Sequence, residues 1–391
     1  MKISVGKRDK SNRSDCFVEL TTKRFGGIKL ELTSKVAPMY KSQIEDLIFN
    51  ICRYFDIRNL SIVMEDYGAL PFTMAARFET ALKRLYPDLE GEFLLPMAKH
   101  AKYKSQKERL RRSRLYLPGN SPKFFVNAGL HQPDGIILDL EDSVAPSEKD
   151  AARLLVRNAL RSVNFYGSER MVRINQLPMG LDDLDFIIPH NVHVVLIPKV
   201  ESKEQIHEVE EKVLAIKKAK KIRTDIYFMP IIESALGVEN AYEIASASKF
   251  NCALAIGLED YTADIGAERT LDGKESFYAR SKVVNAAKAA GIQAIDTVFS
   301  DVSDMEGLKN SVIEAKSLGF EGKGCIHPRQ IKVVHEAFKP TEEEIEKAKR
   351  IVEAYEEAEK NGSGVVSIGS KMIDAPVVKR AQRILTLIQK N

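Results

Sequence analysis

The sequence predicts an α/β protein: a (β/α)₈ barrel with a C-terminal helical extension, preceded by a small α+β domain. The chain has 391 residues, which accommodates a barrel of ~250 residues and a further small domain. From residue 113 onward, short apolar runs alternate with stretches of helical periodicity. Most of these runs are continuously apolar, as expected for parallel strands buried on both faces.

Residues 1–95 form the predicted α+β domain. Two of its segments alternate apolar and polar residues, which is typical of half-buried strands, and an RFGG turn separates them. A helix, a third strand, and a segment that starts extended and becomes helical are expected to follow. The five predicted elements span residues 16–23, 27–34, 41–55, 60–66 and 72–86.

Residues 96–112 form a basic connector between the two domains. The stretch from Lys99 to Arg114 holds eight Lys and Arg residues against one Glu, a local charge of +7. The whole chain carries only +4, so the remainder is net negative and a general nucleic-acid-binding surface is not indicated. We expect the connector to be a solvated linker helix; a site for an anionic partner is the alternative.

Residues 113–391 form the predicted barrel with its C-terminal helices. The eight expected strands are 114–119, 135–142, 171–175, 192–198, 226–232, 252–257, 294–299 and 322–328. Two tail helices, 341–360 and 375–389, flank a Gly/Ser-rich segment that is expected to be a mobile loop.

The cysteines and the apolar runs exclude several classes of protein. The four cysteines are far apart in the sequence and form no CxxC pair, so neither a zinc site nor a disulfide framework is expected. A reducing compartment, the cytoplasm, is the expected location. No apolar run approaches the ~18 residues needed to span a bilayer, so no membrane association is expected.

Charged side chains follow the predicted strands at the end where such barrels carry function. Asp139 and Glu141 follow the second strand, Arg173 the third, Glu233 the fifth and Asp260 the sixth. Carboxylates this close together repel each other unless a cation neutralises them. Because the candidate ligands are oxygen atoms, without a His or Cys cluster, the expected metal is Mg²⁺.

Each of these residues also has a structural interpretation. Glu233 and Asp260 precede helical runs and would serve as helix caps or first-turn acids. Arg173 would pair with the carboxylates that follow the second strand. The convergence of several strand ends, rather than any single residue, is what favours an active site.

From about residue 112 to 383 the chain resembles the β subunit of citrate lyase and its relatives, the HpcH/HpaI aldolase family. The resemblance rests on eight motifs in the family's order: RSRLYLPGNSPKF, GIILDLEDSVAPSEKDAAR, VRIN, IPKVES, IIESALGVENA, AIGLEDYTADIG, GFEGKGCIHPRQI and GSKMIDAPVVKRA. It implies a barrel that assembles into homotrimers or hexamers. It also implies that Glu233 and Asp260 bind Mg²⁺, that Arg173 contacts substrate, and that Asp374 is supplied across a subunit boundary.

The first 90 or so residues are similar to the γ subunit of citrate lyase, the acyl carrier protein. CFVELTTK, IKLELTS and EDYGALPFTMAARFETALKRL carry this likeness. In that family a serine before the first strand bears the prosthetic arm. A gapless alignment places Arg13 on the modified position, which departs from the family pattern, and Ser14 one residue later. Ser14 is therefore the candidate attachment residue.

Together these observations predict a carbon–carbon lyase that cleaves a citryl-type (3-hydroxy-3-carboxyacyl) thioester, with Mg²⁺ as cofactor and a CoA-type thioester as substrate carrier. Arg173 would offset charge on the thioester enolate, and Asp374 would be the general acid. Asp139 and Glu141 would orient Arg173, Lys199 or metal-bound water at the substrate.

Three alternatives to this function remain open. The same site would suit a malyl-CoA or citramalyl-CoA lyase, or a malate-synthase-like condensing enzyme running the reaction in reverse. A non-catalytic scaffold with a degenerate carrier domain would instead recruit partners, among them other citrate-lyase-type subunits. Binding of nucleic acid by the basic connector is a third and weaker possibility.

Overall fold

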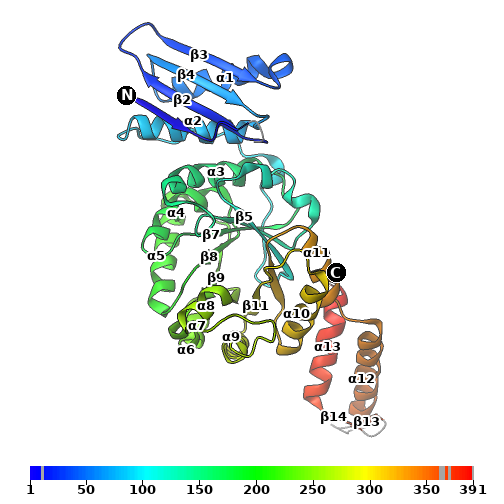
Figure 1. The fold of residues 1–391 in the computed structure, drawn as a ribbon. Helices are drawn as coiled ribbons and strands as arrows, with labels where there is room; N and C mark the ends of the chain where they lie inside the picture. The colour runs from blue at the N-terminus through cyan, green and yellow to red at the C-terminus, as the bar shows by residue number, and fades with distance from the viewer. Residues whose placement is uncertain (10–12, 361–365, 369–370, 390–391) are drawn as a thin grey trace.

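The structure is a computed structural model that describes residues 1–9, 13–360, 366–368 and 371–389 (Figure 1). A small α+β domain, a closed barrel and a helical hairpin follow one another along the chain. The fold class expected from the sequence is confirmed.

Eight parallel strands close the barrel. They are β5 (Ser113–Pro118), β6 (Gly135–Asp139), β7 (Glu169–Arg173), β8 (Val194–Ile197), β9 (Tyr227–Ile232), β10 (Ala253–Ile256), β11 (Gln293–Val298) and β12 (Gly322–Cys325). Parallel pairing of β12 with β5 completes the ring. Each of the eight strands starts within two residues of a predicted run and ends within three, because most strands buried on both faces leave an apolar segment in the sequence.

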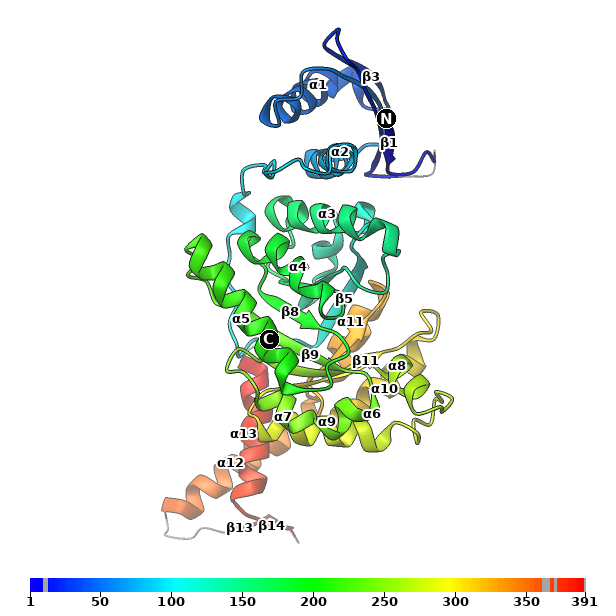
Figure 2. The same cartoon turned by 90° about the vertical axis from the view of Figure 1, so that its left-hand side faces the viewer.

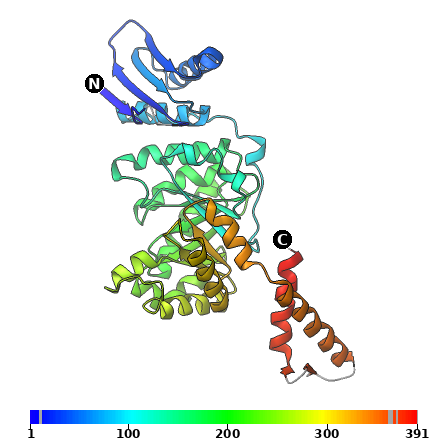
Figure 3. The ribbon, with the colours of Figure 1, turned by 45° about the vertical axis from the view of Figure 1, so that its right-hand side comes forward.

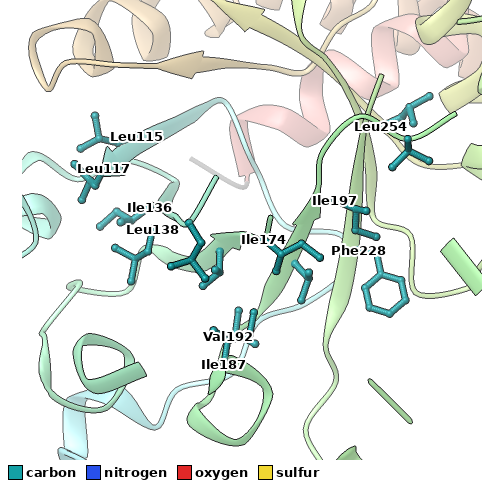
Figure 4. Packing of buried hydrophobic residues seen from close by; sticks show 14 of the residues in the cluster. Leu115, Leu117, Ile136, Leu138, Ile174, Ile187, Val192, Ile197, Phe228 and Leu254 are labelled. Carbon is teal, nitrogen blue, oxygen red and sulfur yellow. The ribbon is translucent and has the colours of Figure 1, made fainter. Parts of the chain in front are cut away.

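Helices surround the barrel and cover its outer face. They are α3 (Lys149–Ser162), α4 (Met179–Ile187), α5 (Lys203–Lys220), α6 (Ala235–Glu239), α7 (Ala241–Ser246), α8 (Leu258–Asp264), α9 (Phe277–Ala289), α10 (Met305–Leu318) and α11 (Arg329–Phe338). The main core fills the layer between strands and helices, where Ile136 and Leu138 of β6 pack (Figure 4). The intervening Ile137 belongs to a separate cluster inside the barrel, as the two-residue period of a strand requires.

Local polar contacts fix where individual helices begin and end. At the start of α5, Ser202 and Gln205 form a reciprocal capping box. Asp304 caps α10 by accepting a hydrogen bond from Gly307 N at 2.8 Å. Gly319 ends α10 with φ of 104°, a left-handed conformation that glycine adopts without steric cost.

The N-terminal domain is a four-stranded sheet with two helices on one face. Its elements are β1 (Lys2–Val5), β2 (Cys16–Thr22), β3 (Ile28–Ser34), α1 (Ala37–Tyr54), β4 (Leu60–Asp66) and α2 (Pro71–Leu85). The strand order is β1-β2-β4-β3, so the two strands on either side of the RFGG turn are separated by β4. Strand β1 lies in the basic N-terminal segment and was not predicted. The expectation of an extended start to α2 is wrong, because Pro71 already lies in its first turn, where a fixed φ favours the helix.

The N-terminal domain packs on the barrel through α2, which lies along α3 (Figure 2). Arg157 of α3 and Glu79 of α2 form an ion pair of 2.6 Å in which neither side chain is exposed. Asn158 donates a hydrogen bond to the carbonyl of Phe72 at 3.1 Å. Phe72 itself joins the barrel's main apolar core. The two units therefore share a buried interface.

The connector 96–112 is not the solvated helix that its composition suggested. Apart from the short 3₁₀ turn η1 (Lys99–Ala101), it forms no helix and crosses the N-terminal end of the barrel. Arg111 is fully buried and donates two hydrogen bonds to Glu169, at 2.6 and 2.8 Å. Tyr103 donates to the carbonyl of Ser168. Lys107 and Arg109 donate to the carbonyls of Lys249 and Gly167, so several basic residues of the connector bind fixed acceptors.

The tail forms a hairpin of α12 (Glu342–Lys360) and α13 (Ala375–Gln389), which projects from the barrel (Figure 3). Both predicted tail helices are confirmed. The connection, which was expected to be a loop, contains two short antiparallel strands, β13 (Val366–Ile368) and β14 (Lys371–Ile373). Among the described residues, every helix is too short or too polar to cross a bilayer.

Candidate active site

A cavity of about 500 Å³ opens at the C-terminal ends of the barrel strands. We call it the mouth cavity. Its lining is rich in charged residues from different strands and the loops that follow them. The charged lining residues are Arg114, Asp139, Asp142, Arg173, Glu233, Glu259, Asp260 and Asp296. The predicted convergence of strand ends at one mouth is therefore present in the structure.

Arg173, the last residue of β7, is held by carboxylates that follow β6. Its Nε and Nη2 donate to the two oxygens of Asp139 at 2.7 and 2.8 Å. Its Nη1 lies 2.8 Å from Glu141 Oε2. The register of the sheet explains the pairing, because Asp139 and Arg173 are partners on adjacent strands. Burial acts to raise the pKa of Asp139, but the Arg173 guanidinium outweighs it and holds that pKa below its usual value.

Glu233 follows β9 and is only 5% exposed. Its Oε2 accepts a hydrogen bond from Lys199 N at 2.8 Å. Its side chain lies against Gly257, where an added Cβ would come within 2.5 Å of Oε1, so a larger residue there would displace the Glu233 carboxylate. Burial raises the pKa of Glu233 to about 8, although Arg173 and the Lys199 amide act in the opposite direction.

Lys199 connects carboxylates that follow two non-adjacent strands of the barrel, β6 and β10. Its ammonium lies 3.4 Å from Glu141 Oε1 and 3.5 Å from Asp260 Oδ1. Asp260 lies in the first turn of α8 and is partly exposed to the cavity. Lys199 has φ of 49°, a left-handed conformation unusual for a residue with a side chain. Its position after β8 was visible in the sequence, but its bridging between two carboxylates was not.

Glu233 and Asp260 fit a magnesium site. They follow β9 and β10, which pair with each other in the barrel. Within the described residues Glu233 Oε1 has no hydrogen-bond donor, so one oxygen of a deeply buried carboxylate is available to a cation. The described residues contain no cluster of three or more His, Cys, Asp or Glu arranged to hold a metal. Two carboxylates suit Mg²⁺, which usually keeps several positions for water and substrate oxygens.

Arg114 is a lining residue that the sequence prediction missed. It lies on β5 and is 1% exposed. One of its nitrogens contacts Met229 Sδ at 3.1 Å and another the carbonyl of Asp296 at 3.4 Å, while its Nε has no partner within the described residues. The signal that could have identified Arg114 is its charge within a strand that is expected to be buried. The guanidinium of Arg114 is a cation without a carboxylate partner within the described residues, and it lies in the barrel interior beneath the carboxylates of the mouth cavity.

Two predicted site residues lie elsewhere. Asp374 is at the start of α13, where its Oδ1 accepts a hydrogen bond from Val377 N at 3.3 Å. It does not line the mouth cavity of its own chain, because the hairpin carries it away from the barrel (Figure 3). Ser14 lies in the N-terminal domain, half-buried, with its amide bonded to the carbonyl of Tyr67 at 3.2 Å. Neither residue is brought to the mouth within one chain.

Comparison with protein families identifies both domains. Residues 112–328 match the family described as HpcH/HpaI aldolase/citrate lyase. Residues 10–85 match the acyl-carrier-type family described as malonate decarboxylase delta subunit (MdcD). The barrel match spans more than half of the chain. Both resemblances expected from the sequence, to citrate lyase and to an acyl carrier, are confirmed.

Individual relatives agree with the family matches. The citrate lyase β subunit of Leuconostoc mesenteroides is 44% identical over 73% of this chain and 95% of its own length. The mitochondrial citramalyl-CoA lyase of Rattus norvegicus is 35% identical over 80% of this chain and 96% of its own. The Mycobacterium tuberculosis protein CitE, solved with magnesium, acetoacetate and coenzyme A, superimposes with a TM-score of 0.59 at 30% identity, covering 72% of this chain and 98% of that chain. The chain belongs to the HpcH/HpaI aldolase/citrate lyase family and is a carbon–carbon lyase.

Proposed function

We propose that the chain is a Mg²⁺-dependent lyase that cleaves a 3-hydroxy-3-carboxyacyl thioester of the citryl type into an oxo acid and an acyl thioester. The observation that carries the proposal is the deeply buried Glu233, which lies beside Asp260 and Arg173 at the barrel mouth. The magnesium and coenzyme A in the CitE structure support this choice of metal and thioester.

The residues at the mouth have distinct roles in this proposal. Glu233 and Asp260 would hold Mg²⁺, which when bound polarises the substrate's carboxylate and hydroxyl oxygens. The hydroxyl proton passes to solvent water, the hydroxyl carbon and oxygen become the new carbonyl of the oxo acid, the carbon–carbon bond breaks, and its electron pair moves into the thioester enolate. Arg173, held rigid by Asp139 and Glu141, offsets the enolate charge. Its planar fork suits an oxyanion better than an ammonium does.

Asp374 of a second copy of this chain would protonate the enolate carbon and complete the acyl thioester. The placement of Asp374 at the end of a projecting hairpin supports delivery across a subunit boundary, in a homotrimer or hexamer (Figure 1). Mixing Asp374→Asn protein with Glu233→Gln protein should restore partial activity, since some mixed interfaces pair two intact residues. No recovery, with subunit exchange confirmed separately, would contradict delivery in trans.

The substrate choice has one supported alternative, a citramalyl-CoA thioester. The mitochondrial citramalyl-CoA lyases align with more of this chain than the citrate lyase β subunits do, 80% against 73% for the two relatives above. A malyl-CoA lyase or a malate-synthase-like condensing enzyme would use the same metal and arginine.

A panel of substrates tests the proposal. The purified chain is incubated with Mg²⁺ and, separately, citryl-, citramalyl- and malyl-CoA, and release of the oxo acid is followed. Citryl-CoA should give the highest kcat/KM. Preference for another thioester would replace the substrate, and absence of turnover with all three, in both directions, would favour the scaffold alternative.

The form in which the thioester is carried is part of the same proposal. We favour free CoA thioester over an arm on Ser14, because Arg13 occupies the aligned carrier position. Intact mass of the protein purified from its source should equal that of the bare chain. An added mass on Ser14 would instead make the N-terminal domain a carrier, and would favour assembly with other citrate-lyase-type subunits.

A further inference from the structure

The floor of the mouth cavity holds a buried arginine. Arg114 lines the cavity, yet it is only 1% exposed. It lies on β5 two positions before Tyr116, which packs against the apolar cluster inside the barrel. Side chains two residues apart on a strand share a face, so Arg114 points into the barrel interior one layer deeper than Tyr116. The mouth cavity therefore reaches below the strand ends to this guanidinium.

Arg114 has few acceptors for its five N–H donors. Its Nη1 lies 3.1 Å from Met229 Sδ, a weak acceptor, and its Nη2 lies 3.4 Å from the carbonyl oxygen of Asp296. The carboxylate of Asp296 is already shared by two other cations, since it accepts from Lys323 at 2.7 Å and from Arg280 at 3.2 and 3.1 Å. Arg114 is therefore left without a carboxylate partner in the part of the chain that the structure describes.

Burial of this charge is costly. It lowers the pKa of Arg114 from its ordinary value, because the loss of hydration outweighs the attraction of Asp296. Arg111, equally buried at the N-terminal end, is instead paired with Glu169 through two hydrogen bonds. The fold thus supplies a carboxylate to one buried arginine and leaves the other facing a cavity. A carboxylate of a ligand in that cavity would supply the missing charge.

The four substituents of a citryl carbon leave one carboxylate for the floor of the cavity. That carbon carries a hydroxyl, a carboxylate, the thioester arm and a carboxymethyl arm. Mg²⁺ at Glu233 and Asp260 would bind the hydroxyl and the first carboxylate, and the thioester arm leads out of the mouth to its carrier. The carboxymethyl arm remains to point down the barrel. In a citramalyl thioester a methyl group takes its place.

The depth of Arg114 suits the carboxymethyl arm. Tyr116 lies beside Arg173, whose guanidinium carbon is 5.5 Å from the centre of the Tyr116 ring. Two residues of a strand span about 6.6 Å, so the Arg114 backbone is one such step below the level of Tyr116. The lining at this depth includes Ala255 and Gly324, whose small size leaves room beside Tyr116. A substituent that points down the barrel from the level of Arg173 therefore meets Arg114.

We propose that Arg114 determines the specificity of the mouth cavity by binding the second carboxylate of a citryl-type substrate. The inference rests on the proposed function, which places the hydroxyl and the first carboxylate at Glu233 and Asp260. A guanidinium and a carboxylate form a charge-assisted, bidentate pair. A substrate without this carboxylate leaves the arginine unpaired inside the barrel, so citramalyl and malyl thioesters bind less well.

Removal of the charge with a matched control tests Arg114. Arg114→Met is compared with Arg170→Met, because Arg170 is equally buried on β7 but does not line the mouth cavity. In Arg114→Met, kcat/KM should fall about 10²-fold or more with citryl-CoA and change less than threefold with citramalyl-CoA. In Arg170→Met, the ratio of the two kcat/KM values should equal that of the wild type. An equal loss with both substrates in Arg114→Met would overturn the proposal.

Urea unfolding separates recognition from a structural role. Arg114→Met should unfold at the wild-type midpoint or above it, because an unpaired buried charge does not stabilise the fold. A clearly lower midpoint would show that the fold itself compensates Arg114, which would contradict the proposal.

Binding of two oxo acids tests the same residue without turnover. Oxaloacetate and pyruvate differ by one carboxylate, and each is titrated calorimetrically into the full-length proteins with Mg²⁺. The wild type should bind oxaloacetate about tenfold or more tightly than pyruvate, and Arg114→Met should bind the two alike. The same preference in both proteins, or none in the wild type, would overturn the assignment of Arg114 even if citryl-CoA is cleaved. Loss of the preference in Arg114→Met would support it even if the lyase assignment fails.

Discussion

The two ends of the barrel both bury charged side chains, but they neutralise them differently. At the N-terminal end, Arg111 and Glu169 form two hydrogen bonds, and neither side chain is exposed. At the C-terminal mouth, Glu233 is nearly as deeply buried, but burial outweighs Arg173 and the Lys199 amide and raises its pKa to about 8. The Arg111–Glu169 pair is compensated within the chain, whereas the carboxylates at the mouth outnumber the cations that pair with them.

This difference separates stability from function within one barrel. The connector supplies the N-terminal end with fixed partners, so breaking one pair leaves a buried charge unmatched. The mouth holds several carboxylates against Arg173 and Lys199, and a divalent cation would supply the missing charge. Substitutions at the two ends should therefore have opposite consequences.

The largest expected effect is at the two carboxylates that we propose as metal ligands. Glu233→Gln and Asp260→Asn should each lower kcat by about 10³-fold or more, because in the proposed function each removes a ligand of the cation on which bond cleavage depends. The metal-free variants should unfold in urea at the wild-type midpoint or above it, since a buried and uncompensated carboxylate does not stabilise the fold. Near-wild-type turnover of either variant in Mg²⁺ would show that the metal assignment is wrong.

The opposite result is expected at the N-terminal end. Glu169→Gln removes the charge that compensates Arg111 and should lower the free energy of unfolding by about 3–5 kcal/mol. Turnover per folded molecule should stay at the wild-type value. Asp185→Asn is the control, because its 2.8 Å ion pair with Lys212 is half exposed and should contribute under about 1 kcal/mol. If Glu169→Gln and Asp185→Asn lower the free energy of unfolding by the same amount, the buried pair at the N-terminal end contributes no more than an exposed pair, which would contradict this account.

A conservative change at the mouth should have a smaller but clear effect. Arg173→Lys keeps the charge but loses the planar guanidinium, whose Nε and Nη2 bind both oxygens of Asp139 and whose remaining N–H bonds would face the enolate. We expect kcat to fall about 10²-fold with little change in the unfolding midpoint. Retention of most of the activity would reduce Arg173 to general charge compensation.

The smallest expected effect is acid sensitivity at the N-terminal end. His193 is buried with its Nδ1 accepting from Arg170 N at 3.1 Å and its Nε2 at 2.9 Å from the carbonyl of Tyr103, which requires the neutral ring. Burial lowers the pKa of His193 to about 4. The unfolded chain, with a pKa near 6.5, takes up the proton first, so stability is complete above pH 6.5 and is lost as the pH falls toward 4.

Urea unfolding measures this loss. Between pH 7 and pH 5 the wild type should lose about 2 kcal/mol through His193, and His193→Gln should lose correspondingly less. The exposed His207 provides the control, and His207→Gln should retain the full acid sensitivity. Identical pH profiles for wild type and His193→Gln would contradict this role.

Most of the fold could be predicted because the hydrophobic patterns that identify its strands and helices lie within short stretches of the sequence. Short runs, most of them continuously apolar, identified all eight barrel strands, and helical periodicity identified the tail helices. The partner of a strand is a nonlocal property, so the insertion of β4 between β2 and β3 was not visible. The connector was mispredicted for the same reason, since Glu169 lies 58 residues beyond its partner Arg111.

For the candidate site, the sequence predicted which residues come together. Asp139, Glu141, Arg173, Glu233 and Asp260 all lie at the mouth because the carboxyl ends of parallel strands converge there. The bridging by Lys199 and the burial of Arg114 depend on the path of one loop and on the barrel interior. The position of Asp374 could not be predicted from local patterns, because its separation from the mouth cavity of the same chain depends on the three-dimensional path of the tail hairpin.

Binding of Mn²⁺, an oxygen-seeking stand-in for Mg²⁺, tests the central claim most directly. Electron paramagnetic resonance counts the ions bound per chain in the wild type, Glu233→Gln and Glu169→Gln, without substrate. We predict that the wild type binds one Mn²⁺ per chain and that Mg²⁺ displaces this ion. Glu169→Gln should bind Mn²⁺ in the same way, and Glu233→Gln should not bind it. Unchanged Mn²⁺ binding in Glu233→Gln would contradict the assignment of the barrel mouth as the metal site.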